Sequence, residues 1–285
     1  MKPKMVEQDG IQFEVFSLRQ KIRHRVANPF KNWLLPGSLI RKIMVWSGSP
    51  IVLESLHRPG GWKAMEIIYQ NDPPIGFIDA LSVRDACFPM AIRNRKKLVT
   101  KTIAELVRKY APESCVVIVG VGAGPGTNIQ EGILQSGIDK HKVAAYLIDM
   151  DSDAFEYGKE AAKKRDLEEN VHFIQGDARE ITKHVPNIAP HIVKMIGILE
   201  YLNDEQVLDL FRAMHGAMAP GGSIITHSLE DAYHTTPFLK RALNWHIYTR
   251  TPQHASGLLV RAGFQNIAAK AEPMGIYTVL VAQKA

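Results

Sequence analysis

From residue 114 onward, short apolar runs of strand length alternate with segments of helical pattern. The expected strands are Cys115–Gly120, Val143–Asp149, Val171–Gly176, Ile192–Ile198, Ser223–Leu229 and Tyr277–Gln283. The expected helices lie near Thr127–Ser136, Ser152–Arg165, Asp204–Met218 and Pro252–Ala262. Strands that alternate with helices build a mostly parallel sheet covered by helices on both faces. The sequence therefore predicts a doubly wound α/β fold.

Composition narrows the class of protein. Of the 285 residues, 46% are hydrophobic and 22% are charged, which excludes wholesale disorder. No apolar run approaches the roughly 18 residues of a membrane span, and the N-terminus has no apolar signal-peptide core. Two cysteines cannot form a disulfide framework, and the eleven histidines show no metal-binding spacing. We therefore expect a cytoplasmic protein without a bound metal.

Charge is distributed unevenly along the chain. Residues 1–110 hold 19 basic and 9 acidic residues, a net charge of +10, whereas the net charge of residues 111–285 is −4. A helical pattern over Thr100–Tyr110 leads into the first strand. We therefore expect two parts, a basic and mainly helical N-terminal extension or lid over residues 1–97 and a mildly acidic α/β domain over residues 98–285.

A glycine-rich loop follows the first expected strand. Gly120, Gly122, Gly124 and Gly126 alternate with other residues just before the helix that begins near Thr127. Such glycines allow a tight turn and bring the backbone close to a ligand at a helix N-terminus. The second expected strand ends in Asp149, the position at which nucleotide-binding folds hold ribose hydroxyls. The structural alternative is a tight turn and a helix cap.

Five segments in sequence order resemble class I S-adenosylmethionine (SAM)-dependent methyltransferases. They are Gly122-Ala-Gly124-Pro-Gly126-Thr127, Asp149 with Gly176-Asp177-Ala178, Ile196–Leu202, Leu210–Ser223, and Arg250-Thr-Pro252 with Leu258–Phe264. The first segment differs from a dinucleotide-binding fingerprint, whose third glycine comes later. The resemblance covers residues 98–285 approximately.

The resemblance implies a Rossmann-like sheet of seven strands and SAM as cofactor, with S-adenosylhomocysteine as product. It places the ribose on Asp149 and the adenine near Asp177. The residues that it assigns to cofactor binding are Gly120, Gly122, Gly124, Asp149, Met150, Asp177, Ala178, Gly197 and Tyr201.

The sequence departs from the family pattern at Gly120. The family usually carries an acid there, and that acid contacts the cofactor near its methionine ammonium group. RNA-modifying relatives carry an Asn/Asp-Pro-Pro-aromatic motif after the fourth strand, where this chain has Gly197-Ile-Leu-Glu200. We therefore do not expect a nucleic acid as acceptor.

Methyl transfer to an oxygen or nitrogen nucleophile can require a general base. Glu200 follows the fourth strand, His227 ends the fifth, and His246 lies in a polar and aromatic insert. We take these three as candidate catalytic residues. The alternatives are that Glu200 caps the helix near Asp204 and that the histidines have structural roles.

The sequence thus predicts methyl transfer to a small-molecule or lipid-like acceptor. A cofactor-binding scaffold without turnover, and aminopropyl transfer on the same fold, stay open as alternatives. Residues 19–42 contain seven basic residues and no acid. This stretch suits a membrane-surface contact, an anionic acceptor, RNA or a solvated helix face, and no pattern specifies an oligomeric state.

Overall fold

The computed structural model of this protein describes residues 3–80 and 86–285. Its residues cluster into two compact units, between which the chain passes five times. The first unit is Met1–Lys97, Leu229–Thr249 and Ala271–Tyr277, and the second is Leu98–Ser228, Arg250–Lys270 and Thr278–Ala285. The expected boundary between an extension and a catalytic domain at residue 97 stays a prediction.

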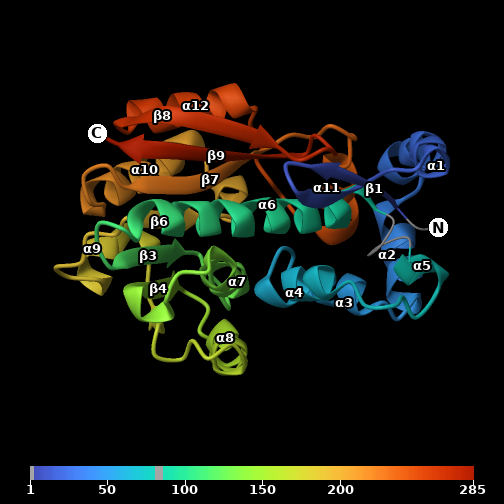
Figure 1. The fold of residues 1–285 in the computed structure, drawn as a ribbon. Helices are drawn as coiled ribbons and strands as arrows, with labels where there is room; N and C mark the ends of the chain where they lie inside the picture. The colour runs from blue at the N-terminus through green and yellow to red at the C-terminus, as the bar shows by residue number, and fades with distance from the viewer. Residues whose placement is uncertain (1–2, 81–85) are drawn as a thin grey trace. The chain divides into compact units, whose positions relative to one another are not determined.

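A seven-stranded sheet organises the second unit (Figure 1). Its strands are β3 (Val116–Val121), β4 (Val143–Asp149), β5 (Val171–Gln175), β6 (Ile192–Met195), β7 (Ser223–Leu229), β8 (Phe264–Ala271) and β9 (Tyr277–Lys284). The order across the sheet is β5-β4-β3-β6-β7-β9-β8, and the pairs among the first five of these strands are parallel. Strands β8 and β9 run in opposite directions in Figure 1. The predicted doubly wound, mostly parallel fold is confirmed.

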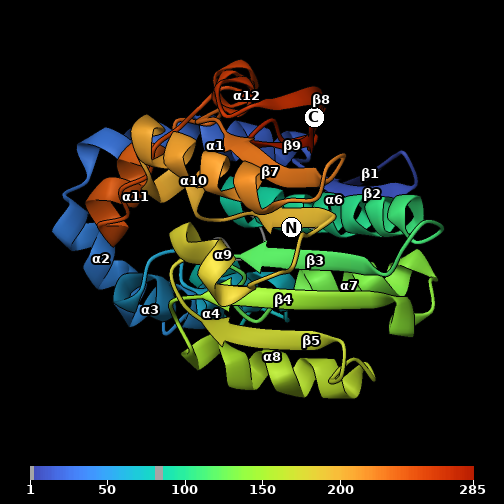
Figure 2. The same ribbon diagram turned by 90° about the vertical axis from the view of Figure 1, so that its left-hand side faces the viewer.

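Helices cover both faces of this sheet, and Figure 2 shows β3, β4 and β5 side by side with α8 along them. The helices and helical turns are α6 (Cys87–Tyr110), α7 (Thr127–Ser136), η3 (Lys140–Lys142), α8 (Asp153–Lys164), η4 (Ala178–Glu180), α9 (Ile181–His184), η5 (Leu199–Tyr201), α10 (Asp204–Ala217) and α12 (Pro252–Arg261). Side chains of α10 and α12 pack with Val119 and Val193 on one face. Ile129 of α7 lies close to Gly120 on the other. Buried on both faces, these central strands are apolar almost throughout.

The first unit begins with a hairpin and continues with helices. The elements are β1 (Lys4–Gln8), β2 (Ile11–Val15), α1 (Leu18–Pro29), the π-helical turn η1 (Phe30–Leu34), α2 (Gly37–Trp46), α3 (Pro50–His57), α4 (Trp62–Gln70), α5 (Phe77–Asp79) and α11 (Thr236–Leu243). Asp9 and Gly10 both have positive φ, so their turn suits the twist of the antiparallel pair β1–β2. This hairpin is an addition to the helical N-terminal region expected from the sequence.

A buried polar network holds this unit together. The Arg93 guanidinium donates to both carboxylate oxygens of Glu14, and its Nε lies 2.7 Å from Oε1. Asn94 donates from Nδ2 to the Glu14 carbonyl and to Glu272 Oε2, at 2.8 and 3.1 Å. Three backbone N–H groups also donate to Glu272, although burial raises the pKa of its carboxyl. Part of the basic segment before β3 is therefore structural.

Candidate functional site

The loop between β3 and α7 contains three glycines with positive φ. The φ angles of Gly122, Gly124 and Gly126 are 56°, 54° and 67°, in the left-handed region that favours glycine. A Cβ on Gly122 would strike the side chain of Ile198, which follows β6. The loop therefore comes against the segment that leads to Glu200, and a larger residue cannot replace Gly122 without displacing that segment.

Asp149, the last residue of β4, closes the other side of the loop. Its Oδ2 accepts from Gly124 N at 2.7 Å, and its Oδ1 accepts from Asp151 N at 2.9 Å. A carboxylate oxygen has two lone pairs, so each oxygen can accept one more hydrogen bond. Asp149 is half-buried, and the next residue, Met150, is 72% exposed. This arrangement can hold a pair of hydroxyl groups against the glycine loop.

Asp177 follows β5 and caps the helical turn η4. Its Oδ1 accepts from Arg179 N at 2.9 Å, and the Arg179 guanidinium also donates to the carboxylate. Because of this pairing, the pKa of the Asp177 carboxyl lies below its usual value. Asp177 and the neighbouring Ala178 are both partly exposed. A ligand that binds there meets an ionised carboxylate already bonded to arginine.

Glu200 and His227 lie together. Glu200 comes after the carboxyl end of β6, and His227 lies inside β7. His227 Nε2 is 3.3 Å from Glu200 Oε2, and both side chains are buried. The neighbouring Gly197 has φ of 90° and open space at its Cβ position, and Tyr201 is partly exposed. A buried carboxylate beside an imidazole can accept a proton and share the resulting charge.

His246 lies elsewhere in the chain. It belongs to the first unit, is exposed, and has its Nε2 at 3.2 Å from Asn244 Oδ1. The structure thus brings Glu200 and His227 together within one unit and gives His246 separate surroundings.

Lys194 is a buried charged residue that the sequence analysis did not single out. It occupies β6, where it pairs with Gly120 of β3 and Ile225 of β7. Alternate residues of a strand share a face, so Lys194 and His227 lie on the same face of the sheet. A single lysine inside the apolar run Ile192–Met195 is the signal that could have identified it.

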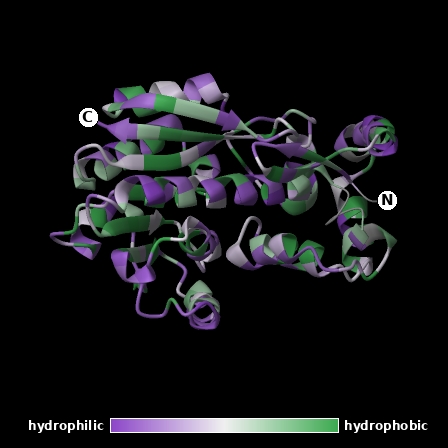
Figure 3. Ribbon diagram, viewed as in Figure 1, coloured by the Kyte–Doolittle hydropathy of each residue, from purple (hydrophilic) through white to green (hydrophobic). Residues whose placement is uncertain are grey.

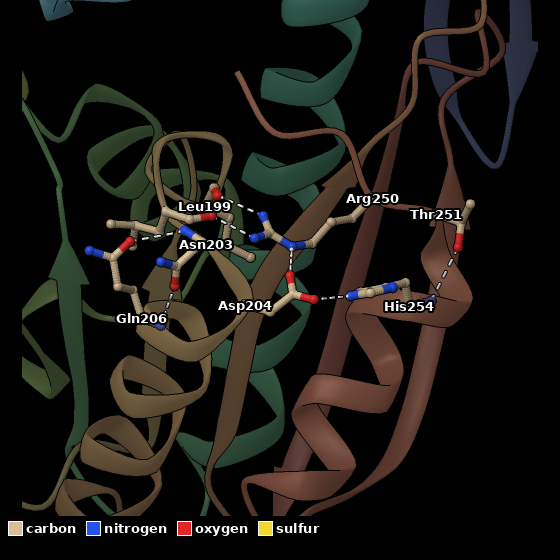
Figure 4. A network of polar contacts seen from close by, with 8 residues as sticks. Leu199, Asn203, Asp204, Gln206, Arg250, Thr251 and His254 are labelled. Carbon is tan, nitrogen blue, oxygen red and sulfur yellow. Dashed lines mark hydrogen bonds and ion pairs between the residues drawn. The ribbon is translucent and has the colours of Figure 1, made fainter. Parts of the chain in front are cut away.

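Arg250 fixes the segment that carries Glu200 (Figure 4). Its guanidinium donates to the carbonyl oxygens of Leu199, the first residue of the short turn η5, and of Leu202, which follows that turn, at 2.8 and 2.5 Å. Its Nε donates to Asp204 Oδ1 at 2.8 Å, and His254 Nε2 lies 2.6 Å from the other oxygen. This pairing, mainly with Arg250, lowers the pKa of the Asp204 carboxyl. Arg250 therefore acts on Glu200 through the backbone.

Two further findings bear on the kind of site. Among residues 3–80 and 86–285, His, Cys, Asp and Glu side chains form no group of three that could hold a metal ion. Within the same residues, every helix is either too short or too polar to cross a membrane.

The strand order and the glycine loop beside Asp149 define the class I methyltransferase fold. Residues 63–284 match the model of the protein family described as "Putative methyltransferase". The chain belongs to this family, and the protein is a SAM-dependent methyltransferase. No curated protein matches its sequence.

Solved structures resemble this fold at low sequence identity. A Bordetella parapertussis protein described as a "possible exported protein" is 15% identical, with a TM-score of 0.68 over 95% of this chain and 99% of its own. The magnesium protoporphyrin IX methyltransferase of Synechocystis PCC 6803, with bound SAH, is 12% identical, with a TM-score of 0.56 over 87% and 99%. An O-methyltransferase family protein from Burkholderia thailandensis is 15% identical, with a TM-score of 0.54 over 83% and 71%. These similarities concern the fold alone.

Proposed function

We propose that this methyltransferase acts on an oxygen or nitrogen nucleophile of a small-molecule or lipid-like acceptor. The buried Glu200–His227 pair carries the proposal, because a hydroxyl or protonated amine must lose a proton when it is methylated. The glycine loop contacts Ile198, two residues before Glu200, so the pair follows directly on the segment that borders the loop.

The residues of the second unit fit SAM. Gly122 and Gly124, both with positive φ, have no side chain that could block a ligand, and the Asp149 oxygens retain acceptor capacity toward ribose hydroxyls. We assign the ribose to Asp149, the adenine edge to the region of Asp177 and Ala178, and the methionine part to the loop beside Gly120 and Gly197. Bound SAM supplies an activated methyl group, and the protein supplies position and electrostatics.

Gly120 stands where the family usually has an acid, and its surroundings explain why none is present. A Cβ there would lie 2.7 Å from Ile129 Cδ1 and 3.0 Å from Leu147 Cδ2. The space is filled with aliphatic side chains, so an ionised carboxylate placed there would lose its hydration without gaining a partner. The methionine ammonium group must therefore find its partner elsewhere in this protein.

The acceptor class can be tested with methyl-tritiated SAM, the full-length protein and fractionated cell extract. We expect label in the organic-soluble or small-molecule fraction. Label recovered only in RNA or protein would contradict the proposed class.

The base is tested with Glu200→Gln and His227→Gln. Loss of a general base typically slows reactions about 10²- to 10⁴-fold, so labelling should fall while SAM affinity stays unchanged. The matched control is His141→Gln, at an exposed histidine of η3. If both site variants label at the wild-type rate, the pair is not the base.

We also propose that the protein works in the cytoplasm. Neither Cys87 nor Cys115 forms a disulfide bond, which agrees with a reducing compartment. Fractionation of the source cells, followed by immunoblotting, should place the protein with cytoplasmic markers, and recovery outside the cytoplasm would contradict this.

A further inference from the structure

Three polar side chains of helix α1 face the protein interior. Gln20, His24 and Asn28 follow one another at intervals of four residues and form its inner face. Gln20 is fully buried, and His24 lies 5.3 Å, between ring centroids, from both Phe16 and Tyr233. Asn28 Nδ2 donates to the Tyr233 carbonyl at 2.7 Å. The inward orientation of α1 is therefore fixed by specific contacts.

The opposite face of α1 is apolar and exposed. Leu18, Ile22 and Val26, with Phe30 at the start of η1, form a stripe at four-residue intervals and are 73%, 56%, 61% and 52% exposed. Helices of globular proteins normally bury such a stripe and expose polar residues, so the polarity of α1 is inverted. Figure 3 shows hydrophobic and hydrophilic positions mixed along this helix. We call these four residues the apolar stripe.

The apolar surface continues beyond α1. Trp33 of η1 is 69% exposed, and Leu39, Ile43 and Trp46 form a second outward row on α2, where Trp46 is 84% exposed. Helix α11 contacts both η1 and α2 within the same unit. Large exposed aromatic and aliphatic side chains gathered in one segment mark an interaction surface.

The charge beside the stripe has one sign. Arg19, Lys21 and Arg25 of α1 are exposed, and no acidic residue occurs between Glu14 and Glu54. An open groove of about 760 Å³ on the same unit is lined by Gly37, Ser38, Arg41, Lys42, Val45, Trp46 and Arg241. Three of these seven residues are basic and none is acidic, so the groove continues the positive surface.

We propose that α1, η1 and α2 dock this protein on an anionic lipid bilayer, with the apolar stripe among the acyl chains and the basic side chains on the headgroups. An exposed apolar face flanked by lysine and arginine is what interfacial helices use to lie in a membrane surface. A second copy of the chain fits this surface less well than a bilayer does. If the two copies met through α1, the positive charges of one α1 would face the same charges on the other. RNA fits less well because the outward face is mostly aliphatic.

Docking is tested by co-sedimentation of the full-length protein with vesicles. One set contains phosphatidylcholine alone, and the other adds phosphatidylglycerol. We expect binding to the anionic vesicles that weakens as salt rises, and little binding to the neutral ones. Failure to bind the anionic vesicles, or equal binding to both sets, overturns the proposal.

The stripe is tested with the triple variant Leu18→Gln/Ile22→Gln/Val26→Gln. The lipid concentration for half-maximal binding should rise about tenfold or more, because burial of these side chains supplies affinity. Val260→Gln on α12 is the matched control, since Val260 is 59% exposed and Val26 is 61% exposed. Circular dichroism should show an unchanged fold in each variant. Binding of the triple variant with wild-type affinity overturns the proposal.

The charges are tested with Arg19→Gln/Lys21→Gln/Arg25→Gln. This variant should lose most of the preference for phosphatidylglycerol and most of the salt dependence. Two outcomes would assign the surface to another partner and overturn the proposal. One is a wild-type dimer, seen by sedimentation velocity, that the stripe variant dissociates. The other is RNA binding that the charge variant loses and the stripe variant keeps.

Discussion

At the scale of single residues, Asp149 links the glycine loop to the end of β4. Its carboxylate accepts from Gly124 N and Asp151 N and retains lone pairs for a ligand. Removing it therefore affects both the shape of the loop and the proposed ribose contact.

We expect Asp149→Ala to weaken SAM binding about ten- to a hundredfold, because a charge-assisted hydrogen bond contributes about 1.5–3 kcal/mol. Asp149→Asn keeps one acceptor oxygen and should lose less. Calorimetry measures both affinities, with Asp153→Ala in the first turn of α8 as the control. Unchanged affinity of a folded Asp149→Ala variant would remove the ribose from this position.

The aliphatic packing around Gly120 can be tested with a single added methyl group. A Cβ at Gly120 meets Ile129 Cδ1 at 2.7 Å and Leu147 Cδ2 at 3.0 Å. Gly120→Ala should therefore destabilise the protein by about 1–3 kcal/mol, because the added methyl group overpacks the core. This loss is expected even though alanine usually suits the interior of a strand better than glycine does.

Ile129→Val removes the Cδ1 atom that the new methyl group would strike, so it should recover part of this loss. Unfolding free energies from urea titration of the two single variants and the double variant give the coupling. Strictly additive effects would mean that the loss at Gly120 has another origin.

At the scale of elements, the sequence located most of the second unit. The expected segments Thr127–Ser136 and Ser223–Leu229 coincide with α7 and β7. These elements have strong apolar periodicity and clear punctuation by glycine or proline. Strand β8 did not stand out, because it is largely exposed and its residues do not alternate in polarity.

Two elements of the first unit show why the rest was harder. The Asp9-Gly10 dipeptide carries a hairpin signal that the sequence analysis did not use. Helix α6 begins at Cys87, well before the expected Thr100, and it contains Arg93 and Arg95. A run of charges normally indicates solvent, but both arginines are buried. Such partners are remote in sequence, so periodicity does not reveal them.

Contacts between residues remote in sequence were also missed at the candidate functional site. Glycines and Asp149 lie beside predicted strands and could be placed by topology. The pairing of Glu200 with His227, and the bonds of Arg250 to η5, join segments that are separated by 27 residues or more in the chain and depend on side-chain packing. Sequence reasoning named Glu200 and His227 singly, without their contact.

The bonds of Arg250 across η5 give a prediction at this scale. Arg250→Lys keeps a positive charge near Asp204 but loses the planar fork that reaches both Leu199 O and Leu202 O. We expect kcat for methyl transfer to the labelled acceptor to fall about ten- to a hundredfold, because a small displacement of the reacting groups slows the reaction strongly. SAM affinity should stay unchanged.

Asp204→Asn is the matched control, since it weakens the ion pair and leaves the two carbonyl contacts in place. It should retain most of the activity. If kcat falls as much in this variant as in Arg250→Lys, then Glu200 is positioned by the ion pair and not by the hydrogen bonds from Arg250 to the two carbonyl oxygens. Equal loss of SAM affinity and kcat would point to a general loss of structure.

At the scale of the whole molecule, the two units are not separable pieces of chain. The chain passes between them five times, and residues 229–249 and 271–277 belong with the N-terminal 97 residues. Leu239 and Tyr277 share a buried cluster with Phe16 and Val52. Truncation at residue 97 would expose that apolar surface, so the extension must be studied within the full chain.

This connectivity predicts one cooperative unfolding transition. All four tryptophans, at positions 33, 46, 62 and 245, lie in the first unit, so their fluorescence reports on that unit alone. Far-UV circular dichroism reports on the helices of both units. Helix α6 contributes residues to each unit, so neither can unfold without breaking a helix that the other needs. In a urea titration, both signals should therefore have the same midpoint and the same slope. A tryptophan transition at clearly lower urea would show that the first unit unfolds independently.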